Sequence, residues 1–264
     1  MAQLVMTAIL GLLLTGCATM RDAPTPDARQ ALAPTGKLRV GLVLGGATSV
    51  KRDPASGEMK GVAFDLGKEL ARRMGVSFDP VLYPSLGALL EGQKSRDWDI
   101  AFFLISPARM KDFDFTAPVV ELEFGYLIPK GSLISTPADI DRPGIRVGVQ
   151  EKSTVDPILS RTLKNATLIR SPGLAAGLEM LKSGKADVFA SNKANLFNMS
   201  DQLPGSRVLD GRFGAERIAM AIPKGRDAGV AYARKFIEDA KAEGLVKAAV
   251  ERAGVRGAVV AVPQ

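Results

Sequence analysis

The amino-acid sequence predicts an α/β fold made of two lobes, each of them a sheet flanked by helices. Three observations predict it. From Lys37 onwards, short β-rich runs alternate with runs of helical periodicity, and after Pro118 the alternation starts afresh. The chain has 264 residues, of which 46% are hydrophobic, so it is long enough to bury two cores of ordinary domain size.

The first set of elements is recognised by its periodicity. Leu66, Leu70 and Ala71, for example, fall on one face of a helix, whereas the neighbouring runs are short and rich in Val and Leu. The predicted order is a strand at 38–44, a helix at 63–74, a strand at 78–82, a helix at 85–93 and a strand at 99–105.

The second set repeats the same alternation. We predict strands at 124–128 and 146–149, a helix at 153–163, a strand at 167–169, a helix at 173–183, a strand at 187–190 and a short helix after Asn192. Strands at 207–209 and 218–222 follow, and then a long helical stretch at 226–253.

An apolar stretch from Leu4 to Leu14 precedes these elements and is shorter than the roughly 17 to 25 residues that span a bilayer. Its end, Leu14-Thr15-Gly16-Cys17, resembles the bacterial lipobox, which implies cleavage before Cys17 and a lipid on its thiol. Residues 1–16 are therefore expected to be a signal peptide, although Met1 to Thr7 lack the usual Lys or Arg. A structural cysteine is the alternative.

Residues 17–36 are expected to be the lipidated cysteine followed by a flexible tether. Pro24, Pro26 and Pro34 stand there among Ala, Asp and Arg, a composition poor in large apolar groups. Such a tether places the folded part at a membrane surface, in the periplasm or cell envelope.

Composition excludes several classes of function. The absence of histidine excludes Ser/His/Asp and Cys/His nucleophile systems, and one cysteine allows neither an internal disulfide nor a thiolate cluster. No metal, no cofactor and no enzymatic activity are predicted. The net charge of +7 could attract anions, but no stretch combines basic residues with stacking aromatics, so nucleic-acid binding is not expected.

Two strand-to-helix turns have residues suited to an anion. In Ile105-Ser106-Pro107-Ala108-Arg109, Ser106 suits an N-cap, Pro107 suits the first helical position, and Arg109 falls in the first turn. A cation is unfavourable there unless it has an anionic partner. A solvated surface arginine is the alternative.

The second turn lies at 147–156, where Ser153 and Asp156 fit a capping box. An ordinary helix start is the alternative. Two such helix ends, one on each lobe, would form a carboxylate site if they faced one crevice at the carboxyl ends of the strands.

These motifs resemble family 3 of the bacterial solute-binding proteins, the periplasmic receptors of amino-acid ABC importers, over roughly residues 37–259. The matching segments are Gly61-Val62-Ala63-Phe64-Asp65-Leu66, the segment from Ile105 to Arg109, and Asp114-Phe115-Thr116-Ala117-Pro118. The resemblance implies a two-lobed periplasmic-binding-protein fold with a two-crossing hinge at 119–123 and 211–216. Lobe 1 then holds residues 37–120 and 214–264, and lobe 2 holds residues 121–213.

The resemblance also implies roles for residues. Arg109 would hold the ligand carboxylate in a bidentate bond, beside Leu104 and Ser106. The turn with Ser153 and Thr154 would close on the same carboxylate through backbone N–H groups. The ligand would be a small carboxylate or an amino-acid-like molecule, the partner an ABC permease, and the protein a monomer.

Departures from the family pattern bear on the ligand. Asn192 occupies the position of the aspartate that pairs with the ligand ammonium, and Phe102, Phe103 and Leu104 replace serines that help to hold it. Only Tyr83 is close to the second of the two aromatic positions that enclose the ligand side chain. We therefore hypothesise a ligand that lacks a free amine or keeps it hydrated.

Two other functions stay open. Some relatives on this fold are dehydratases of cyclohexadienyl acids, which use carboxylates for general acid catalysis. The other is an envelope lipoprotein that senses a ligand or binds a partner protein without any link to transport.

Overall fold

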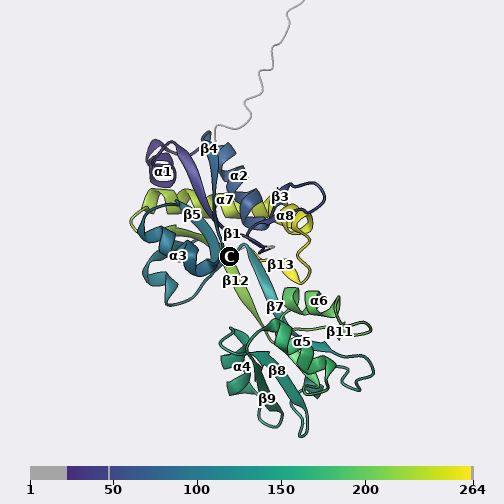
Figure 1. Cartoon of the computed structure of the whole chain (residues 1–264). Coiled ribbons are helices and arrows are strands. Elements are labelled where there is room, and N and C mark those ends of the chain that lie inside the picture. The colour runs from purple at the N-terminus through teal and green to yellow at the C-terminus, as the bar shows by residue number, and fades with distance from the viewer. Residues whose placement is uncertain (1–22, 47, 263–264) are drawn as a thin grey trace, which may run out of the picture.

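The computed structural model describes residues 23–46 and 48–262, and it has the two-lobed α/β fold that the sequence predicts (Figure 1). The predicted signal peptide and Cys17 lie outside the described residues. Lobe 1 contains α1 (Pro26–Leu32), β1 (Lys37–Val43), β2 (Lys51–Arg52), β3 (Met59–Lys60), α2 (Val62–Met74), β4 (Ser77–Tyr83), α3 (Leu86–Lys94), β5 (Ile100–Leu104), η1 (Arg109–Lys111), β6 (Phe113–Phe115), α7 (Asp227–Ala242), α8 (Leu245–Ala253) and β13 (Ala258–Val260).

Lobe 2 is the lower body in Figure 1, and two long strands connect it to lobe 1. It contains η2 (Pro137–Asp139), β8 (Arg146–Gln150), α4 (Val155–Thr162), β9 (Thr167–Ser171), α5 (Leu174–Lys182), β10 (Val188–Asn192), α6 (Lys193–Ser200) and β11 (Arg207–Val208). The connecting strands are β7 (Val120–Ile128) and β12 (Gly214–Pro223). None of the helices described at 23–46 and 48–262 is long and apolar enough to cross a bilayer.

One continuous sheet runs through both lobes in the order β4-β1-β5-β12-β7-β10-β8-β9. The outer strands pair in parallel within each lobe, whereas β7 and β12 are antiparallel and pair from Gly214 opposite Phe124 to Ile218 opposite Val120. The sheets of the two lobes are therefore joined through this strand pair, which is the crossing that the two-lobed fold requires.

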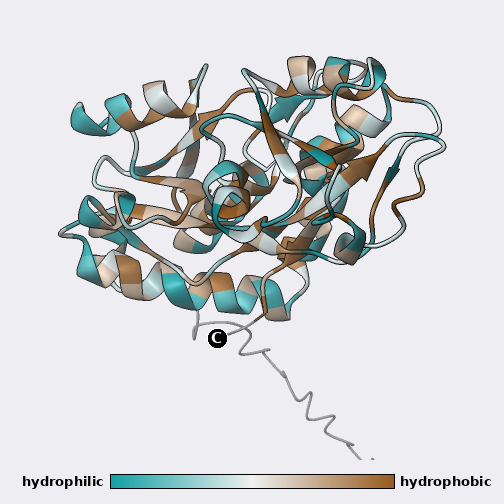
Figure 2. Cartoon of the chain, turned by 90° about the horizontal axis from the view of Figure 1, so that it is seen from below, coloured by the Kyte–Doolittle hydropathy of each residue, from teal (hydrophilic) through white to brown (hydrophobic). Residues whose placement is uncertain are grey.

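Each lobe has its own buried core. In lobe 1, Leu38, Val40 and Leu42 of β1 pack with the apolar face of α2 and with α7, and in lobe 2, residues such as Phe124 and Val147 form a separate cluster. Strands covered on both faces are apolar throughout. Figure 2 shows this as brown strands in the interior and helices that carry both brown and teal residues.

The predicted tether is wrong for part of its length, because Pro26–Leu32 is a helix. Thr25 caps it by accepting a hydrogen bond from the backbone N–H of Ala28 at 3.1 Å, and Pro26 occupies the first helical position. Leu32 is fully buried in the core of lobe 1, where it contacts α7 at Gly229. Ala28 and Leu32, four positions apart on one face of this helix, are its buried residues and pack it against lobe 1.

The predicted helical stretch at 226–253 is also two helices. Gly244 has a φ of +78°, a left-handed conformation that ends α7 and starts α8. After α8 the chain forms β13, which pairs antiparallel with β7 from Val120 to Leu122. The C-terminal segment therefore returns to the crossing between the lobes.

Candidate ligand-binding site

Arg109 lies five positions after Leu104, the last residue of β5, and its side chain folds back towards that strand. Its Nη1 donates a hydrogen bond to the backbone oxygen of Leu104 at 2.8 Å, and its guanidinium lies 5.4 Å from the ring centroid of Phe103. Ser106 accepts a weak hydrogen bond from the backbone N–H of Arg109 at 3.4 Å, and the helix that follows is only the short η1. Burial lowers the pKa of Arg109, and the charge of Glu216 opposes this shift.

The second turn begins α4 with Thr154 as its N-cap. Ser153 Oγ accepts from the backbone N–H of Asp156 at 3.3 Å, so it makes one half of the predicted capping box. Asp156 instead pairs with Arg170 at 2.9 Å, and that bond lowers the pKa of Asp156. Among the described residues, no hydrogen bond uses the backbone N–H of Thr154, so this donor is available to an anion at the start of α4.

Asn192 ends β10 and caps α6. Its Oδ1 accepts from the backbone N–H of Asn195 at 3.0 Å, and its Nδ2 lies 3.5 Å from Oε2 of Glu216, to which it donates. Glu216 belongs to β12 and is partly buried. Reasoning from the sequence missed Glu216, although it lies in the segment 211–216 that was expected to cross between the lobes.

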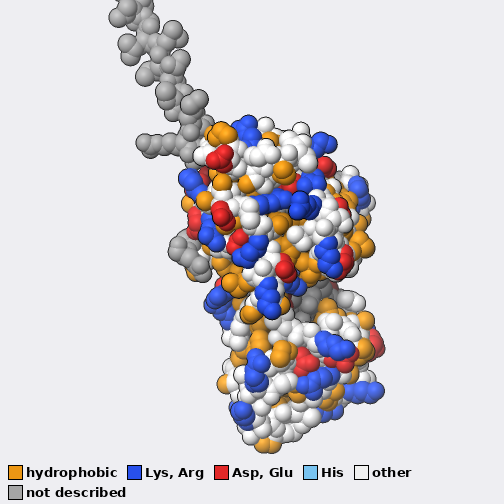
Figure 3. All heavy atoms as spheres, turned by 90° about the vertical axis from the view of Figure 1, so that its left-hand side faces the viewer, with side chains coloured by type: hydrophobic (Ala, Val, Ile, Leu, Met, Phe, Trp, Pro, Cys, Tyr) orange, Lys and Arg blue, Asp and Glu red, His pale blue; other side chains and the backbone are white. Residues whose placement is uncertain are grey.

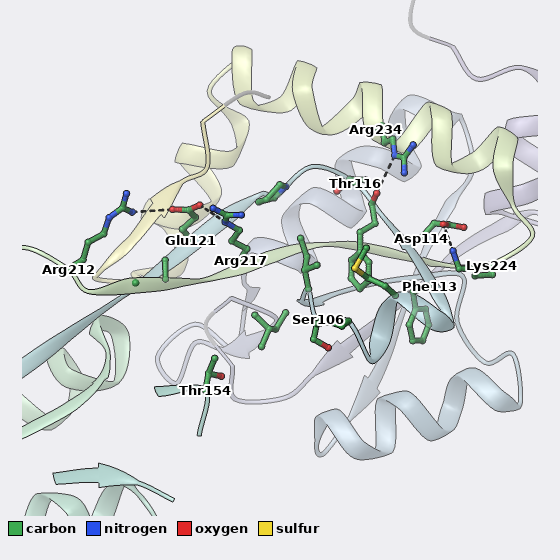
Figure 4. A pocket seen from close by; sticks show the side chains of 18 residues that line it. Ser106, Phe113, Asp114, Thr116, Glu121, Thr154, Arg212, Arg217, Lys224 and Arg234 are labelled. Carbon is green, nitrogen blue, oxygen red and sulfur yellow. Dashed lines mark hydrogen bonds and ion pairs between the residues drawn. The ribbon is translucent and has the colours of Figure 1, made fainter. Parts of the chain in front are cut away.

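A cavity of about 870 Å³ opens beside β12. Leu104 and Ser106 of lobe 1 line it together with Thr154 of lobe 2, and Figure 4 shows Ser106 and Thr154 on the same side of β12. Arg109, Ser153 and Asn192 are not among the residues that line it. The structure thus brings three of the predicted residues to one space between the lobes.

The rim of this cavity is rich in paired charges. Arg212 and Arg217 both pair with Glu121 at 3.2 Å, and Lys224 pairs with Asp114 at 2.7 Å (Figure 4). Figure 3 shows that the molecule narrows between the lobes, with basic side chains spread over both of them. The net positive charge is therefore not gathered into one patch on this face.

A comparison of sequences shows the family to which this two-lobed fold belongs. The family model of the bacterial extracellular solute-binding proteins, family 3, matches residues 47–254, which is more than half of the chain. The chain belongs to this family.

Known relatives of this family-3 protein include transport receptors. The ABC transporter glutamine-binding protein GlnH of Bacillus subtilis (strain 168) is 25% identical over 182 residues, which is 67% of this chain and 66% of GlnH, just under two thirds of that protein. The solved structure of the solute receptor for L-cysteine of Neisseria gonorrhoeae has a TM-score of 0.62 and 25% identity, and the match covers 87% of this chain and 95% of that one.

The fold of this chain is also found in an enzyme. The structure of an ancestral cyclohexadienyl dehydratase has a TM-score of 0.57 and 24% identity, and the match covers 84% of this chain and 94% of that one. At this level of identity the likeness concerns the fold alone.

Tyr83, like Arg109, Ser153 and Asn192, does not line the cavity. Its side chain packs against the aromatic cluster around Trp98 and Phe113, and its ring contacts α3 at Gly92. Burial raises the pKa of its hydroxyl. The side chain of Tyr83 therefore points into the core of lobe 1 rather than into the cavity, and its contact with the ligand stays a prediction.

Proposed function

We propose that this protein is the receptor of an ABC importer, which captures a small carboxylate or amino-acid-like ligand by closing its two lobes. The observation that carries the proposal is the meeting of Ser106 from lobe 1 and Thr154 from lobe 2 at one cavity beside a strand that joins the lobes. Arg109 stands three residues from Ser106 and supplies the positive charge.

The protein's own contacts prepare Arg109 for a carboxylate. Its Nη1 is held by Leu104 and its plane by Phe103, so the guanidinium is oriented before the ligand arrives. The remaining N–H groups are donors with the spacing of two carboxylate oxygens.

Closure would add the second set of donors. The backbone N–H of Thr154 lies at the N-terminus of α4, where the helix dipole favours an anion. A ligand that binds Arg109 and Thr154 together stabilises the closed form over the open one, and this difference in affinity drives closure. The hinge would be the pair β7 and β12, at 119–123 and 211–216.

The remaining expectations complete the proposal. Lobe 1 would comprise α1 together with residues 37–120 and 214–264, lobe 2 residues 121–213, and the protein would act as a monomer. A lipid on Cys17 would hold it at the membrane of the periplasm or cell envelope, near the permease that accepts its ligand.

A thermal-shift screen of the fragment from Ala18 onward against amino acids, keto acids, hydroxy acids and aromatic acids tests the receptor. A ligand at about 100 times its Kd adds about 2.7 kcal/mol to the free energy of unfolding, which raises Tm by roughly 5–10 °C in a protein of this size. We expect Arg109→Ala to abolish the shift and Arg161→Ala, an exposed arginine on α4, to retain it. A panel without any hit contradicts the proposal.

A dehydratase is the second candidate, because a solved relative with this fold is one and because Glu216 is a carboxylate beside the site. General acid catalysis requires such a group. Turnover of prephenate-like acids by the wild-type protein, lost in Glu216→Gln, would favour the enzyme over the receptor.

A further inference from the structure

A second cavity, of about 440 Å³, lies in lobe 1 and shares only Lys224 with the cavity between the lobes. It is surrounded by α1, the end of α3, the start of β1 and the turn between β12 and α7. Figure 1 shows α1 and α3 on the same side of lobe 1. The described residues that line the cavity include no Asp or Glu. Its polar side chains are four cations and two amides, which belong to Arg39, Arg96, Lys224, Arg226, Gln30 and Gln93.

The charges of these four cations are only half compensated. Arg39 and Arg226 share the single carboxylate of Asp99, at 2.8 Å and 3.2 Å, and Asp99 is fully buried. Lys224 pairs with Asp114 at 2.7 Å. Four cations are thus paired with two carboxylates in the described part of the chain, which leaves two positive charges in excess around the cavity.

Arg96 carries one of the excess charges. Its side chain is exposed, and at positions 23–46 and 48–262 no ion pair or hydrogen bond involves its guanidinium. Its φ of +56° is a left-handed conformation that is unfavourable for a residue with a side chain. Two backbone hydrogen bonds hold it there: its N–H donates to Gln93 at 2.9 Å, and its oxygen accepts from Nη1 of Arg39 at 2.8 Å. The fold therefore holds an unpaired arginine beside three other cations, which repel it.

Acidic residues near the cavity do not remove this excess. Asp79 and Asp97 act electrostatically on Arg39, but neither of them lines the cavity. Asp79 lies 3.9 Å from Lys37, outside the cavity, and its side chain is 41% exposed. Charges in that position are screened by water and salt, so they compensate the cations of the cavity only weakly.

We propose that this cavity binds a phosphate group. A phosphate monoester carries a charge of about −1.5 to −2 near neutral pH, which matches the two positive charges in excess. The planar guanidinium of Arg96 offers two parallel donors to phosphate oxygens, and the amides of Gln30 and Gln93 add neutral donors. A carboxylate with one charge would leave half of the excess unpaired. This site is separate from the ligand cavity and does not depend on the proposed receptor function.

The phosphate group could belong to a soluble molecule or to a lipid headgroup. Thr25, the N-cap of α1, stands eight positions after Cys17, a length of at most about 29 Å when the chain is extended. The lipid proposed on Cys17 would therefore hold this side of lobe 1 near the headgroups of a membrane. The experiment has one arm for each source.

The first arm uses soluble phosphates. Protein from Ala18 onward, which contains every described element, is titrated by calorimetry with inorganic phosphate, glycerol 3-phosphate and acetate at constant ionic strength. A hydrogen bond to a charged group contributes enough that Arg96→Gln should lose about 10- to 100-fold in affinity for the phosphate that binds. Gln30→Glu adds a carboxylate to the lining and should also weaken binding by at least about tenfold. Arg161→Gln removes the same net charge from an exposed arginine of lobe 2 and should bind as the wild type does.

The second arm uses vesicles of phosphatidylcholine with and without phosphatidylglycerol, which the same proteins are made to sediment with. Binding that requires phosphatidylglycerol and is lost in Arg96→Gln but not in Arg161→Gln would assign a lipid headgroup. The same pattern with soluble phosphates would assign a free phosphate compound.

The variants are designed to leave the fold intact. Arg96 and Gln30 are exposed, so Arg96→Gln and Gln30→Glu should keep the Tm of the wild type, and a loss of binding is then not a loss of fold. Absence of binding in both arms, equal affinity for acetate and phosphate, or equal losses in Arg96→Gln and Arg161→Gln would each overturn the phosphate site. None of these results would alter the test of the receptor by Arg109→Ala.

Discussion

Arg109 shows how a single residue can be identified from its unfavourable position. A cation in the first turn of a helix is repelled by the positive end of the helix dipole. Such a residue is therefore expected where the helix is short or where the charge has an anionic partner. In the structure the helix is short, because η1 spans only Arg109–Lys111. The guanidinium of Arg109 turns back to Leu104 and Phe103. The guanidinium of Arg109 is therefore held in place by contacts within lobe 1.

Asp99 is the residue whose removal should cost most stability. Its side chain is fully buried and pairs with Arg39 at 2.8 Å and Arg226 at 3.2 Å. Asp99→Ala leaves two guanidinium groups without their partner, so we expect a loss of about 3–5 kcal/mol in the free energy of unfolding, measured by urea denaturation. Asp79→Ala is the control, because the side chain of Asp79 is 41% exposed and lies 3.9 Å from Lys37, and the variant should change stability by less than about 0.5 kcal/mol.

At the scale of elements, the two lobes use the same clamp between parallel strands. Arg39 at the start of β1 donates its backbone N–H and its guanidinium to Asp99, directly before β5. Arg146 at the start of β8 does the same to Asp187, directly before β10. Each clamp fixes the relative positions of two strands at their amino ends, and so it also fixes where their carboxyl ends present Leu104 and Asn192.

A second element-scale contact should make stability depend on pH. Glu69 of α2 pairs with Arg72 at 2.7 Å and Arg73 at 2.9 Å, and Arg73 also pairs with Glu243 after α7. The bond to Arg72 lowers the pKa of Glu69 from 4.5 to about 2, against the opposing effect of burial. Because the folded-state pKa is depressed, this stabilisation is complete above pH 4.5 and is lost as the pH falls towards 2.

The corresponding prediction is that Glu69→Gln lowers the free energy of unfolding by about 1–2 kcal/mol at pH 7. The difference from the wild type should fall below half of that value near pH 3 and vanish below about pH 2. Urea denaturation at these pH values measures it. Glu91→Gln, which removes an exposed pair with Lys94, should give no such pH dependence, and a constant penalty for Glu69→Gln at all pH values would refute the assignment.

At the scale of the whole molecule, motion between the lobes depends on the strands that join them. Besides β7 and β12, the segment after α8 contacts lobe 2, because Arg256 pairs with Asp201 and lies 5.1 Å from the ring centroid of Phe197. The cores of the lobes remain separate. Rotation about the joining strands is therefore the motion that disturbs the fewest buried contacts.

Closure should be visible in solution. With a ligand found by the thermal-shift screen, we expect small-angle scattering to show a decrease in the radius of gyration of the wild-type protein. Arg109→Ala at the same ligand concentration should keep the larger value. A radius of gyration that is unchanged at saturation would indicate binding without closure and would contradict the proposed mechanism.

The sequence by itself determined the two-lobed α/β fold and the order of its elements, because periodicity and turn residues act over a few positions along the chain. It also indicated Arg109, Ser106 and Thr154 as neighbours of a site at the ends of strands. Only the tertiary structure decided that Leu32 is buried and that Tyr83 points into the core. It also revealed Glu216 beside Asn192, since that contact depends on the register of strands 24 positions apart in the chain, which no local pattern encodes.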